Sequence, residues 1–430
     1  MSVEEVKKKL NEVVDQAQVR LDLETANNPA LRKAIHIVEN FLKKTGRVCY
    51  GGQAINAQLP QKDQFYNPET SLPDYDFFSP EATDDTEALI AEFKASGYTE
   101  ISKRIGIHEG TTKIYVNFTA IADITSVIPD FYKNIHKKSA IIHGIRYADP
   151  VFLRMMMYLE LSRPRGQVDR WKKVYERLTL LDQAHPLAGC KHVAHPIVES
   201  KAAQVARPDL VRYMIANKRA FLGADIQVLY KPSATRSAPA RTRFLLQGSA
   251  PVVFLSPDAD MDGSILSDLT RTKKVSITGY QNILPAMIAL YSGDDLVSLI
   301  VQEEACHAII SLPLTKQRHL RLASLETVLT FMIGLYYRDE TLLMAGSSVQ
   351  CWLKQYIDLS DRYKIKPTKL IPAFPLECTG YQTSFASLLR AKGARIEAAR
   401  QQLSRGKMTV KTRGRRFIDR GSRQTRRRYL

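Results

Sequence analysis

The spacing of apolar residues divides the first half of the chain into helices and strands. In residues 29–45 apolar side chains recur every three or four positions, Asn28 precedes them as a capping residue, and Gly46 follows them, which predicts a helix. Residues 48–50 are a short apolar run typical of a strand, and residues 74–78 alternate in the manner of a strand. The same rules predict helices over residues 2–22, 83–96 (with Asp84 and Glu87 as a variant of the capping box), 149–164 and 169–184, and three strands within residues 98–128.

The second half of the chain predicts another mixed α/β region, after a change of composition near residues 185–196. We expect a helix over 208–218, strands near 225–230 and 251–255, and helical runs near 281–303 and 320–337. No short-period repeat is evident. From about residue 405 the chain is rich in Arg, Gly, Ser and Thr, which predicts disorder when the segment is alone.

Composition bounds the class of protein. Hydrophobic residues make up 44% of the 430 positions and charged residues 25%, as in a globular protein of two or three domains. The first residues lack an apolar signal core, and no apolar run approaches the length of a membrane span, so we expect a protein that is neither secreted nor membrane-spanning. The five cysteines are scattered and never form a CxxC pair, which indicates reduced thiols, an intracellular setting and no structural zinc.

The positive charge is concentrated at the C-terminus. The net charge is +18, and residues 390–430 hold 15 Lys or Arg against 2 Asp or Glu. A basic terminal segment usually binds a polyanion, which is nucleic acid or, less often, an anionic membrane.

Two glycines stand where a predicted strand meets a predicted helix. Gly51 and Gly52 follow Val48–Tyr50 directly. Glycine lets a ligand approach the backbone closely, and the exposed N–H groups that begin a helix suit a phosphate. An ordinary tight turn explains the same pair equally simply, so the glycines need support from the residues that follow.

That support comes from an Asp-x-Asp strand. Asp74 and Asp76 are two positions apart, so both carboxylates face the same side of a strand, where a cation such as Mg²⁺ or Mn²⁺ would relieve their repulsion. Asp123 lies in a later strand-like run and could complete a two-metal site for attack on a phosphate. A solvated strand face for the pair, and a strand-end backbone contact for Asp123, remain alternatives. Asp149 is the weaker candidate because it already caps a helix.

This ordered set resembles the DNA polymerase β-like nucleotidyltransferase superfamily. The segments YGGQAIN, LPDYDFFSP, HGIRYADPVFLRMMMYLELSRPRG and RWKKVYERLTLL together are similar to the catalytic subunit of poly(A) polymerases from nucleocytoplasmic large DNA viruses. The similarity covers most of residues 47–185 and continues weakly beyond them. The interval between Gly52 and Asp74 is longer than in the short superfamily pattern, so the loop at 60–72 is a candidate for a role of its own.

The resemblance implies an α+β fold of two nucleotidyltransferase-like mixed α/β domains, the first active and the second degenerate. The implied parts are an N-terminal helical segment (1–46), the catalytic domain (47–185), the second domain (186–389) and a basic, largely disordered tail (390–430). Asp74, Asp76 and Asp123 would hold two Mg²⁺ or Mn²⁺ ions. The phosphates of ATP would contact Gly51, Gly52, Asn56 and Lys173. Lys173 is chosen from three basic residues on one helix face, Arg170, Lys173 and Arg177, which could also be a solvated surface. The tail residues expected to bind RNA are Arg413, Arg415, Arg416, Arg426, Arg427 and Arg428.

The implied activity is template-independent addition of AMP from ATP to the 3′ end of RNA. Two alternatives stay open: a nucleotidyltransferase for another NTP or acceptor, and a catalytically inactive RNA-binding processivity or scaffold protein. The resemblance also implies a homodimer or a separate processivity factor as partner, no membrane, and a place in the host cytoplasm, in viral factories, or in the virion. For the tail, a targeting or protein-docking role is the alternative to RNA binding.

One further acidic segment imitates a calcium site. Residues 258–269 match an EF-hand loop at several positions, but Leu269 stands where a bidentate Glu is required, and a strand precedes the segment where a helix should enter. We therefore expect an acidic surface turn there.

Overall fold

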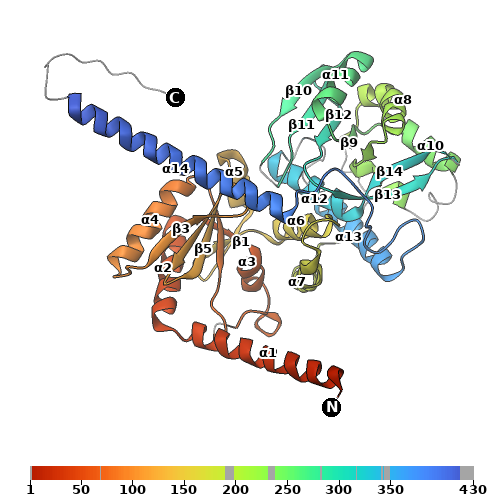
Figure 1. Cartoon of the computed structure of the whole chain (residues 1–430). Helices are drawn as coiled ribbons and strands as arrows, with labels where there is room; N and C mark the ends of the chain where they lie inside the picture. Colours follow the sequence, from red (N-terminus) through yellow and green to blue (C-terminus); the bar gives the residue numbers. More distant parts are fainter. Residues whose placement is uncertain are drawn as a thin grey trace.

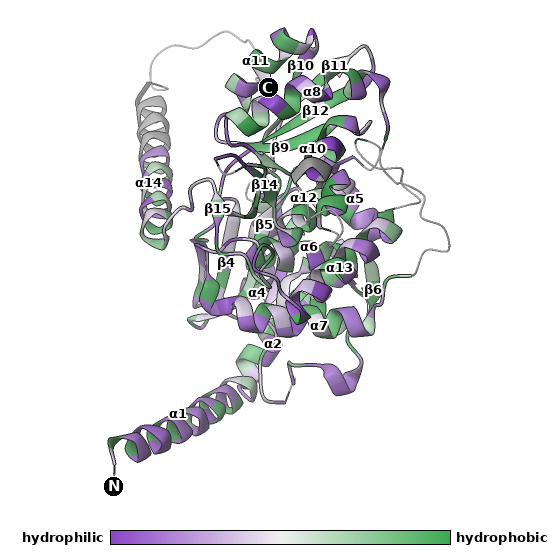
Figure 2. Cartoon of the chain, turned by 90° about the vertical axis from the view of Figure 1, so that its right-hand side faces the viewer, coloured by the Kyte–Doolittle hydropathy of each residue, from purple (hydrophilic) through white to green (hydrophobic). Residues whose placement is uncertain are grey.

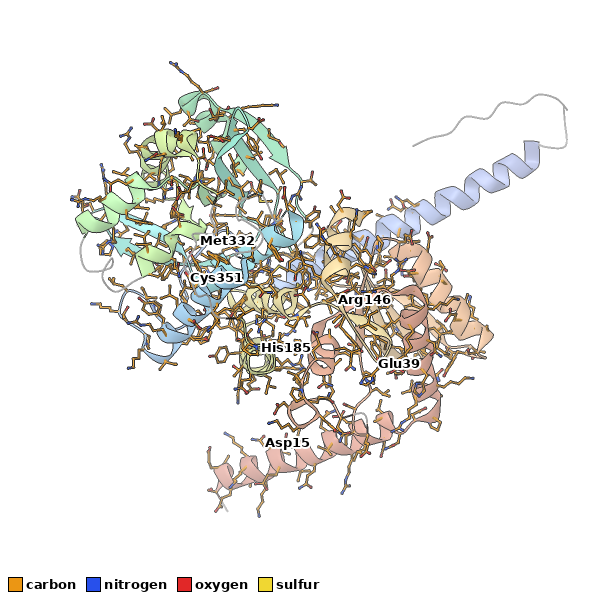
Figure 3. All side chains as sticks on the ribbon, turned by 180° about the vertical axis from the view of Figure 1, so that it is seen from behind. Asp15, Glu39, Arg146, His185, Met332 and Cys351 are labelled. Carbon is orange, nitrogen blue, oxygen red and sulfur yellow. A yellow bond between two sulfur atoms is a disulfide. The ribbon has the colours of Figure 1, made fainter. Side chains whose placement is uncertain are left out.

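Helix α2 (Pro29–Thr45) leads the chain into the first of two sheets, and its ends are those that the sequence predicts. Asn28 accepts hydrogen bonds from the backbone N–H groups of Ala30 and Leu31, and Gly46 ends the helix at φ 64°, a left-handed conformation that favours glycine. One face of α2 is buried on the first sheet. Helix α1 (Val3–Ala26) begins at a capping box of Ser2 and Glu5 and projects away from the body of the protein, as Asp15 shows in Figure 3.

The computed structural model describes residues 2–67, 69–188, 198–230, 238–280, 283–315, 317–339, 342 and 349–416, and among these it leaves out the side chains of Ala224, 238–240, Thr242 and 403–416. The described residues form two lobes, each with one mixed sheet (Figure 1). None of the described helices has the length and apolar character needed to cross a membrane.

The first lobe contains a seven-stranded sheet in the order β3-β4-β5-β2-β1-β7-β6. Its strands are β1 (Val48–Tyr50), β2 (Tyr75–Ser79), β3 (Ile101–Ile105), β4 (Thr111–Val116), β5 (Thr119–Ser126), β6 (Ala140–Ile142) and β7 (Ile145–Tyr147). Its other helices are α3 (Gly51–Ala57), η1 (Gln61–Asp63), α4 (Ala82–Ala95), α5 (Pro129–Lys138), α6 (Pro150–Leu161), η2 (Val168–Arg170) and α7 (Trp171–Ala184). The strands predicted within residues 98–128 and the helices capped by Asn28 and Asp149 are confirmed.

The second lobe repeats this topology with an eight-stranded sheet in the order β10-β11-β12-β9-β8-β14-β13-β15. Its strands are β8 (Ala220–Phe221), β9 (Val252–Ser256), β10 (Lys273–Ile277), β11 (Met287–Ser292), β12 (Asp295–Gln302), β13 (His307–Pro313), β14 (His319–Ala323) and β15 (Cys378–Thr379). Its helices are α8 (Lys201–Ala216), η3 (Ala224–Tyr230), α10 (Ala238–Gln247), α11 (Ala259–Thr270), α12 (Leu325–Arg338) and α13 (Val349–Ile365). Figure 2 shows β9 and β12 as strongly hydrophobic strands, in keeping with the burial of their apolar side chains.

The two lobes share a side-chain network as well as a strand order. In the first lobe, Asp85 of α4 accepts hydrogen bonds from Arg47 and from Ser79 at the end of β2. In the second lobe, Asp262 of α11 accepts the same bonds from Arg219 and Ser256. The matching segments are FFSPEATDD (77–85) and FLSPDADMD (254–262), an internal repeat that the sequence analysis missed.

This repeat corrects two predictions about acidic residues. The capping box expected at Asp84 and Glu87 is absent, since the cap of α4 is Glu81 without a side-chain hydrogen bond. The acidic surface turn expected at 258–269 is helix α11, capped by Asp258, and Asp262 is fully buried in its ion pair with Arg219.

Two other predictions for the second lobe were wrong, and the bounds of a third are corrected. The helical run at 281–303 is largely the hairpin of β11 and β12, which turns at Gly293 with φ 61° and pairs with β9. The strand at 225–230 is the short helix η3, whose apolar side chains are buried at helical spacing. The helix at 208–218 begins earlier, at Lys201, because Ser200 caps it and Pro208 is tolerated inside it.

The cysteine prediction is also corrected. Cys306 and Cys378 form a disulfide, with their Cα atoms 5.4 Å apart. The antiparallel pairing of β13 with β15 brings the two residues together although 72 positions separate them. Sequence spacing alone gives no sign of this contact.

The basic C-terminal segment differs from the expectation of disorder over its first part. Helix α14 runs from Phe385 to Arg416 and returns to the first lobe, where Arg395 donates hydrogen bonds to the carbonyl groups of Gly106 and Ile107 in the turn between β3 and β4. Figure 1 shows α14 lying across the first lobe.

The lobes meet through equivalent helices. Helices α6 and α12, which follow the equivalent strands β7 and β14, pack against each other. The Tyr337 hydroxyl of α12 donates a hydrogen bond to Asp149, the residue that caps α6. The carboxylate that the sequence marked as a helix cap therefore also ties the lobes together.

Candidate active site

Strand pairing brings the three predicted carboxylates to one place. Strands β2 and β5 run parallel, and Asp76 lies directly beside Asp123. Asp74 is two positions before Asp76 and faces the same side of the chain. On the other side of β2, Tyr50 pairs with Asp76, so the glycine turn begins next to the carboxylates.

The carboxylates are held in an environment that disfavours their charge. Burial, with the added charges of Asp74 and Asp123, raises the pKa of Asp76 to about 8. Burial and the charge of Asp123 also raise the pKa of Asp74. Asp123 is only 7% exposed, and its Oδ1 atom is buried without a hydrogen-bond partner. Three mutually repelling carboxylates with an unsatisfied buried oxygen indicate a site that requires positive charge.

One positive charge comes from a residue that the sequence analysis missed. Lys113 of β4 lies opposite Asp123 of β5 in the antiparallel ladder, and its ammonium group forms an ion pair with Asp123 Oδ2. Burial lowers the pKa of Lys113, but the hydrogen bond to Asp123 and the charges of all three carboxylates outweigh burial, so the net shift is upward. A lysine in a strand carries no sequence signal of this contact, because register decides it.

The donor set fits hard divalent cations such as Mg²⁺ or Mn²⁺. All three residues offer carboxylate oxygens, and the free Oδ1 of Asp123 is a ligand atom without a competing partner. Within the described residues, no three His, Cys, Asp or Glu side chains stand close enough together to hold a metal as they are. Lys113 engages the second oxygen of Asp123, so a cation would have to share or replace that contact.

The glycine turn leaves no room for larger residues. Gly51 has φ 74°, and a Cβ atom there would lie 2.4 Å from Asp76 Oδ2. A Cβ atom on Gly52 would lie 2.7 Å from the Tyr66 hydroxyl and 2.9 Å from Arg177 Nη1. The chain therefore needs glycine at both positions to pack its own carboxylate, tyrosine and arginine around the turn.

Arg177 is the basic residue that reaches this turn. Its Nη2 donates a 2.9 Å hydrogen bond to the Tyr66 hydroxyl, and its guanidinium lies over the rings of Phe65 and Tyr66. The long loop noted in the sequence supplies both aromatic residues. It thus has a role of its own, which is to position Arg177 beside Gly52.

The two remaining residues predicted to contact phosphate are Asn56 and Lys173, and this role stays a prediction for both. Asn56 is buried, and its Oδ1 accepts hydrogen bonds from the backbone N–H groups of Phe65 and Tyr66, so it holds the loop. Lys173 lies on α7, where burial and the neighbouring Arg177 lower its pKa. Within the described part of the chain, neither residue forms a hydrogen bond or ion pair with the carboxylates.

A third basic residue of the predicted helix face, Arg170, acts on the carboxylates through its charge. Arg170 forms an ion pair with Glu160. Its charge lowers the pKa of Asp76, against the larger effects of burial and neighbouring carboxylates that raise it. Arg170 thus contributes positive potential to the site without a direct contact to Asp76.

The predicted RNA-binding arginines cannot be placed at the site. Arg413, Arg415 and Arg416 belong to the end of α14 whose side chains are left out of the structure. Arg426, Arg427 and Arg428 lie outside the described residues.

The second lobe lacks the carboxylates at the equivalent positions. Alignment through Ser79 and Ser256 places Pro251 and Val253 at the positions of Asp74 and Asp76. The pairing of β9 with β12 places Leu299 beside Val253, where the first lobe has Asp123. Of the two described copies of the repeat, the first alone therefore carries a candidate site for metal-dependent chemistry.

In the comparison with known proteins, the family match falls on the lobe that carries the three carboxylates. A family model described as "Poly(A) polymerase catalytic subunit" matches residues 36–167, so the predicted resemblance is confirmed over the first lobe. Two relatives named "Putative poly(A) polymerase catalytic subunit" come from Acanthamoeba polyphaga mimivirus and African swine fever virus (strain Badajoz 1971 Vero-adapted). The first is 30% identical over 189 residues, which are 42% of this chain and 32% of the relative. The second is 28% identical over 172 residues, which are 38% and 35%. The chain thus aligns with about a third of the length of each.

A solved structure shares the fold of nearly the whole chain. The crystal structure of the Megavirus polyadenylate synthase superposes with a TM-score of 0.75 at 19% identity and covers 93% of this chain and 83% of that one. The predicted α+β fold is confirmed by this match.

Proposed function

We propose that this chain is a template-independent poly(A) polymerase, which adds AMP from ATP to the 3′ end of RNA. The observation that carries the proposal is the meeting of Asp74, Asp76 and Asp123 beside the Gly51–Gly52 turn. The match of residues 36–167 to the poly(A) polymerase catalytic subunit family supports it.

Asp74, Asp76 and Asp123 are the residues that would hold two Mg²⁺ or Mn²⁺ ions. When bound, such ions neutralise charge at the reacting phosphorus and make the 3′-hydroxyl more acidic. The raised pKa of Asp74 and Asp76 and the orphaned Asp123 Oδ1 support this assignment, because each reflects a shortage of positive charge.

The remaining groups bind and orient the substrates. Arg177 and Tyr66 present a guanidinium and a hydroxyl beside Gly52, which suits the phosphates that leave as pyrophosphate. The absence of a side chain at Gly52 lets those phosphates approach the backbone. Positioning and electrostatics would dominate, since phosphoryl transfer asks little covalent work of a protein.

The bond changes balance without a further reactant. The 3′-oxygen of RNA forms a bond to the α-phosphorus of ATP, the bond from that phosphorus to the bridging oxygen breaks, and pyrophosphate leaves. The hydroxyl proton departs as the new bond forms. We assign the Asp123 carboxylate to help remove that proton, since it is the site carboxylate with a buried oxygen that has no hydrogen-bond partner among the described residues.

The proposal is tested by incubating an unstructured RNA primer with each NTP in turn. We expect extension with ATP in the presence of Mg²⁺ or Mn²⁺ and none with a chelator. A preference for UTP or CTP would favour a nucleotidyltransferase of another specificity. No extension with any NTP would favour an inactive RNA-binding scaffold.

Partners and location are further parts of the proposal. The RNA 3′ end is the expected macromolecular substrate, and a second copy of the chain or a separate processivity factor is the expected protein partner. Mass measurement in solution with and without RNA separates these two. A viral factory in the host cytoplasm, or the virion, is the proposed location.

A further inference from the structure

The second lobe has a large open groove that the proposed chemistry does not use. It lies between the C-terminal end of α8 and the outward face of the β13–β14 hairpin, with a volume of about 870 Å³. The pairing of Ser311 with Arg321 and of Pro313 with His319 puts these side chains on one face of the hairpin, while Leu320 and Leu322 face the core. Its basic lining residues are Arg212, Lys218, Arg318, His319 and Arg321.

The groove is basic and poorly neutralised. Among the described residues, no carboxylate forms an ion pair with Lys218, Arg318 or Arg321. Arg212 pairs with Asp209 at the surface, and the one acidic residue of the described lining, Glu377, accepts a hydrogen bond from Ser311. Exposed like charges gathered in one concave surface repel one another, so they indicate an anionic ligand.

Arg321 has a defined place in this groove. Its Nη1 donates a 3.2 Å hydrogen bond to the carbonyl group of Lys218, which links the hairpin to the end of α8. Lys218 has φ 55°, a left-handed conformation that turns the chain sharply after α8. The two elements that carry the charge are thereby fixed relative to each other.

The longer hairpin beside this groove is a property of the second lobe. The equivalent hairpin of the first lobe, β6 and β7, has three residues in each strand, whereas β13 and β14 have seven and five. The added length of the second hairpin carries Arg318 and His319. The second lobe also lacks carboxylates at the positions equivalent to Asp74, Asp76 and Asp123. The second copy thus combines a missing metal site with a longer, basic hairpin.

We infer that this groove binds the phosphate backbone of single-stranded RNA upstream of the 3′ end that reacts in the first lobe. This inference rests on the proposed function. Arginine suits the role because its planar fork pairs with phosphate and stacks on unpaired bases. The open lining favours a polymer over a small anion, since the charges come from two separate elements and do not line an enclosed cavity.

The test compares two triple variants of the full-length protein that remove the same charge. The groove variant is Lys218→Gln, Arg318→Gln and Arg321→Gln. The control is Lys273→Gln, Lys366→Gln and Lys369→Gln, three exposed lysines outside the groove. Binding of fluorescent single-stranded oligo(A) is measured by anisotropy over a salt series, with circular dichroism and melting to verify folding.

We expect the groove variant to bind oligo(A) roughly tenfold or more weakly at low salt, and the slope of log K against log salt to fall by about 2, since each single-strand phosphate contact adds about 0.7. The control should keep the affinity and slope of the wild type. The groove would be overturned as an RNA site if both variants lost the same affinity for oligo(A), or if neither lost any. Polyglutamate that competes with RNA at equal charge concentration would also overturn it, because the surface would then suit an acidic protein.

A separate readout keeps this inference apart from the proposed activity. Extension of a short primer at saturating concentration depends on the first lobe and should survive in the groove variant. If the wild type binds oligo(A) through the groove but extends no primer, the groove stands and the polymerase assignment fails. If the wild type extends primers and the groove variant binds RNA normally, the polymerase assignment stands and the groove fails as an RNA site.

Discussion

At the scale of single residues, the site depends on how charge is balanced among buried carboxylates. Lys113 supplies the counter-charge to Asp123, with Asp74 and Asp76 close enough to raise its pKa. In the substrate-free site, the repulsion among the three acids is offset by a cation, from the protein or from solution, or by a proton held on Asp76.

We predict that Lys113→Met lowers the melting temperature in a chelator by several degrees and increases the stabilisation that Mn²⁺ gives. The reason is that Asp123 then has no cationic partner, and metal binding meets no competitor. The matched control is Lys103→Met on the neighbouring strand, whose partner Glu87 is exposed, so its removal should change the melting temperature much less. Identical melting curves for Lys113→Met and wild type, with and without Mn²⁺, would contradict this account.

A second prediction concerns pH. The pKa of Asp76 is raised to about 8, so between pH 4 and pH 8, roughly, the folded protein retains a proton that the unfolded chain has released. The free energy of unfolding should therefore fall as pH rises through that range. In a chelator, Asp76→Asn should show much less of this pH dependence and melt above wild type near the upper end. Parallel melting-temperature profiles for the two proteins would show that the carboxyl titrates normally.

At the scale of elements, the repeated network at the start of α4 and α11 locks each helix to its sheet. Asp262 is fully buried and accepts hydrogen bonds from Arg219, Ser256 and the Tyr213 hydroxyl. Asp85 has the equivalent position in the first lobe, at 9% side-chain exposure. The network persists in the lobe without catalytic carboxylates, so its role is to support the fold.

We predict that Asp262→Asn destabilises the second lobe by about 3–5 kcal/mol, because a largely buried arginine is left without its counter-charge. Asp268→Asn on the exposed side of α11 is the control and should change stability by less than about 0.5 kcal/mol. Urea unfolding followed by the fluorescence of Trp352, which is buried in α13, reports on this lobe when both variants carry Trp171→Phe. Equal midpoints for the two variants would refute the structural role of the network.

The sequence predicts the elements whose signals are local. Asn28, Gly46 and Asp149 mark helix ends by their own chemistry, and Asp-x-Asp carboxylates share a face because strand periodicity requires it. Lys113 could not be predicted, since strand register decides where it lies. Arg177 was one of three basic residues on a predicted helix face, and the choice of Lys173 over it had no access to the loop that holds Arg177 beside Gly52. The hairpin of β11 and β12 was mistaken for helix because pairing with β9 overrides local preference. The repeat of SPEATDD in SPDADMD was visible in the sequence and would have supported, from the residues alone, the second domain that the resemblance implies.

At the scale of the whole molecule, the two lobes share one plan but differ in the chemistry of their surfaces. The first keeps the carboxylates and the glycine turn, and the second carries the basic groove. Helix α14 returns from the second lobe to the first and is held there by Arg395. An RNA strand bound by the groove, the basic C-terminal segment and the active site would contact both lobes at once.

We predict that deletion of residues 405–430 weakens RNA binding and flattens its salt dependence, independently of the groove variant. The deleted segment holds many of the basic residues of the C-terminus, and each single-strand phosphate that the protein no longer binds lowers the slope by about 0.7. Extension at saturating primer should be unchanged. Equal slopes for full-length and shortened protein would favour a targeting or docking role for the segment.

The central claim is that nucleotidyl transfer to RNA takes place at Asp74, Asp76 and Asp123 in the first lobe. The most direct measurement is the rate of primer extension from ATP by wild type and by Asp76→Asn, with Asp268→Asn on the exposed side of α11 as control. The account predicts an ATP-dependent ladder for wild type and control, and a rate lower by on the order of 10²-fold or more for Asp76→Asn, with the folded state retained. Extension by Asp76→Asn within a few-fold of wild type would contradict it.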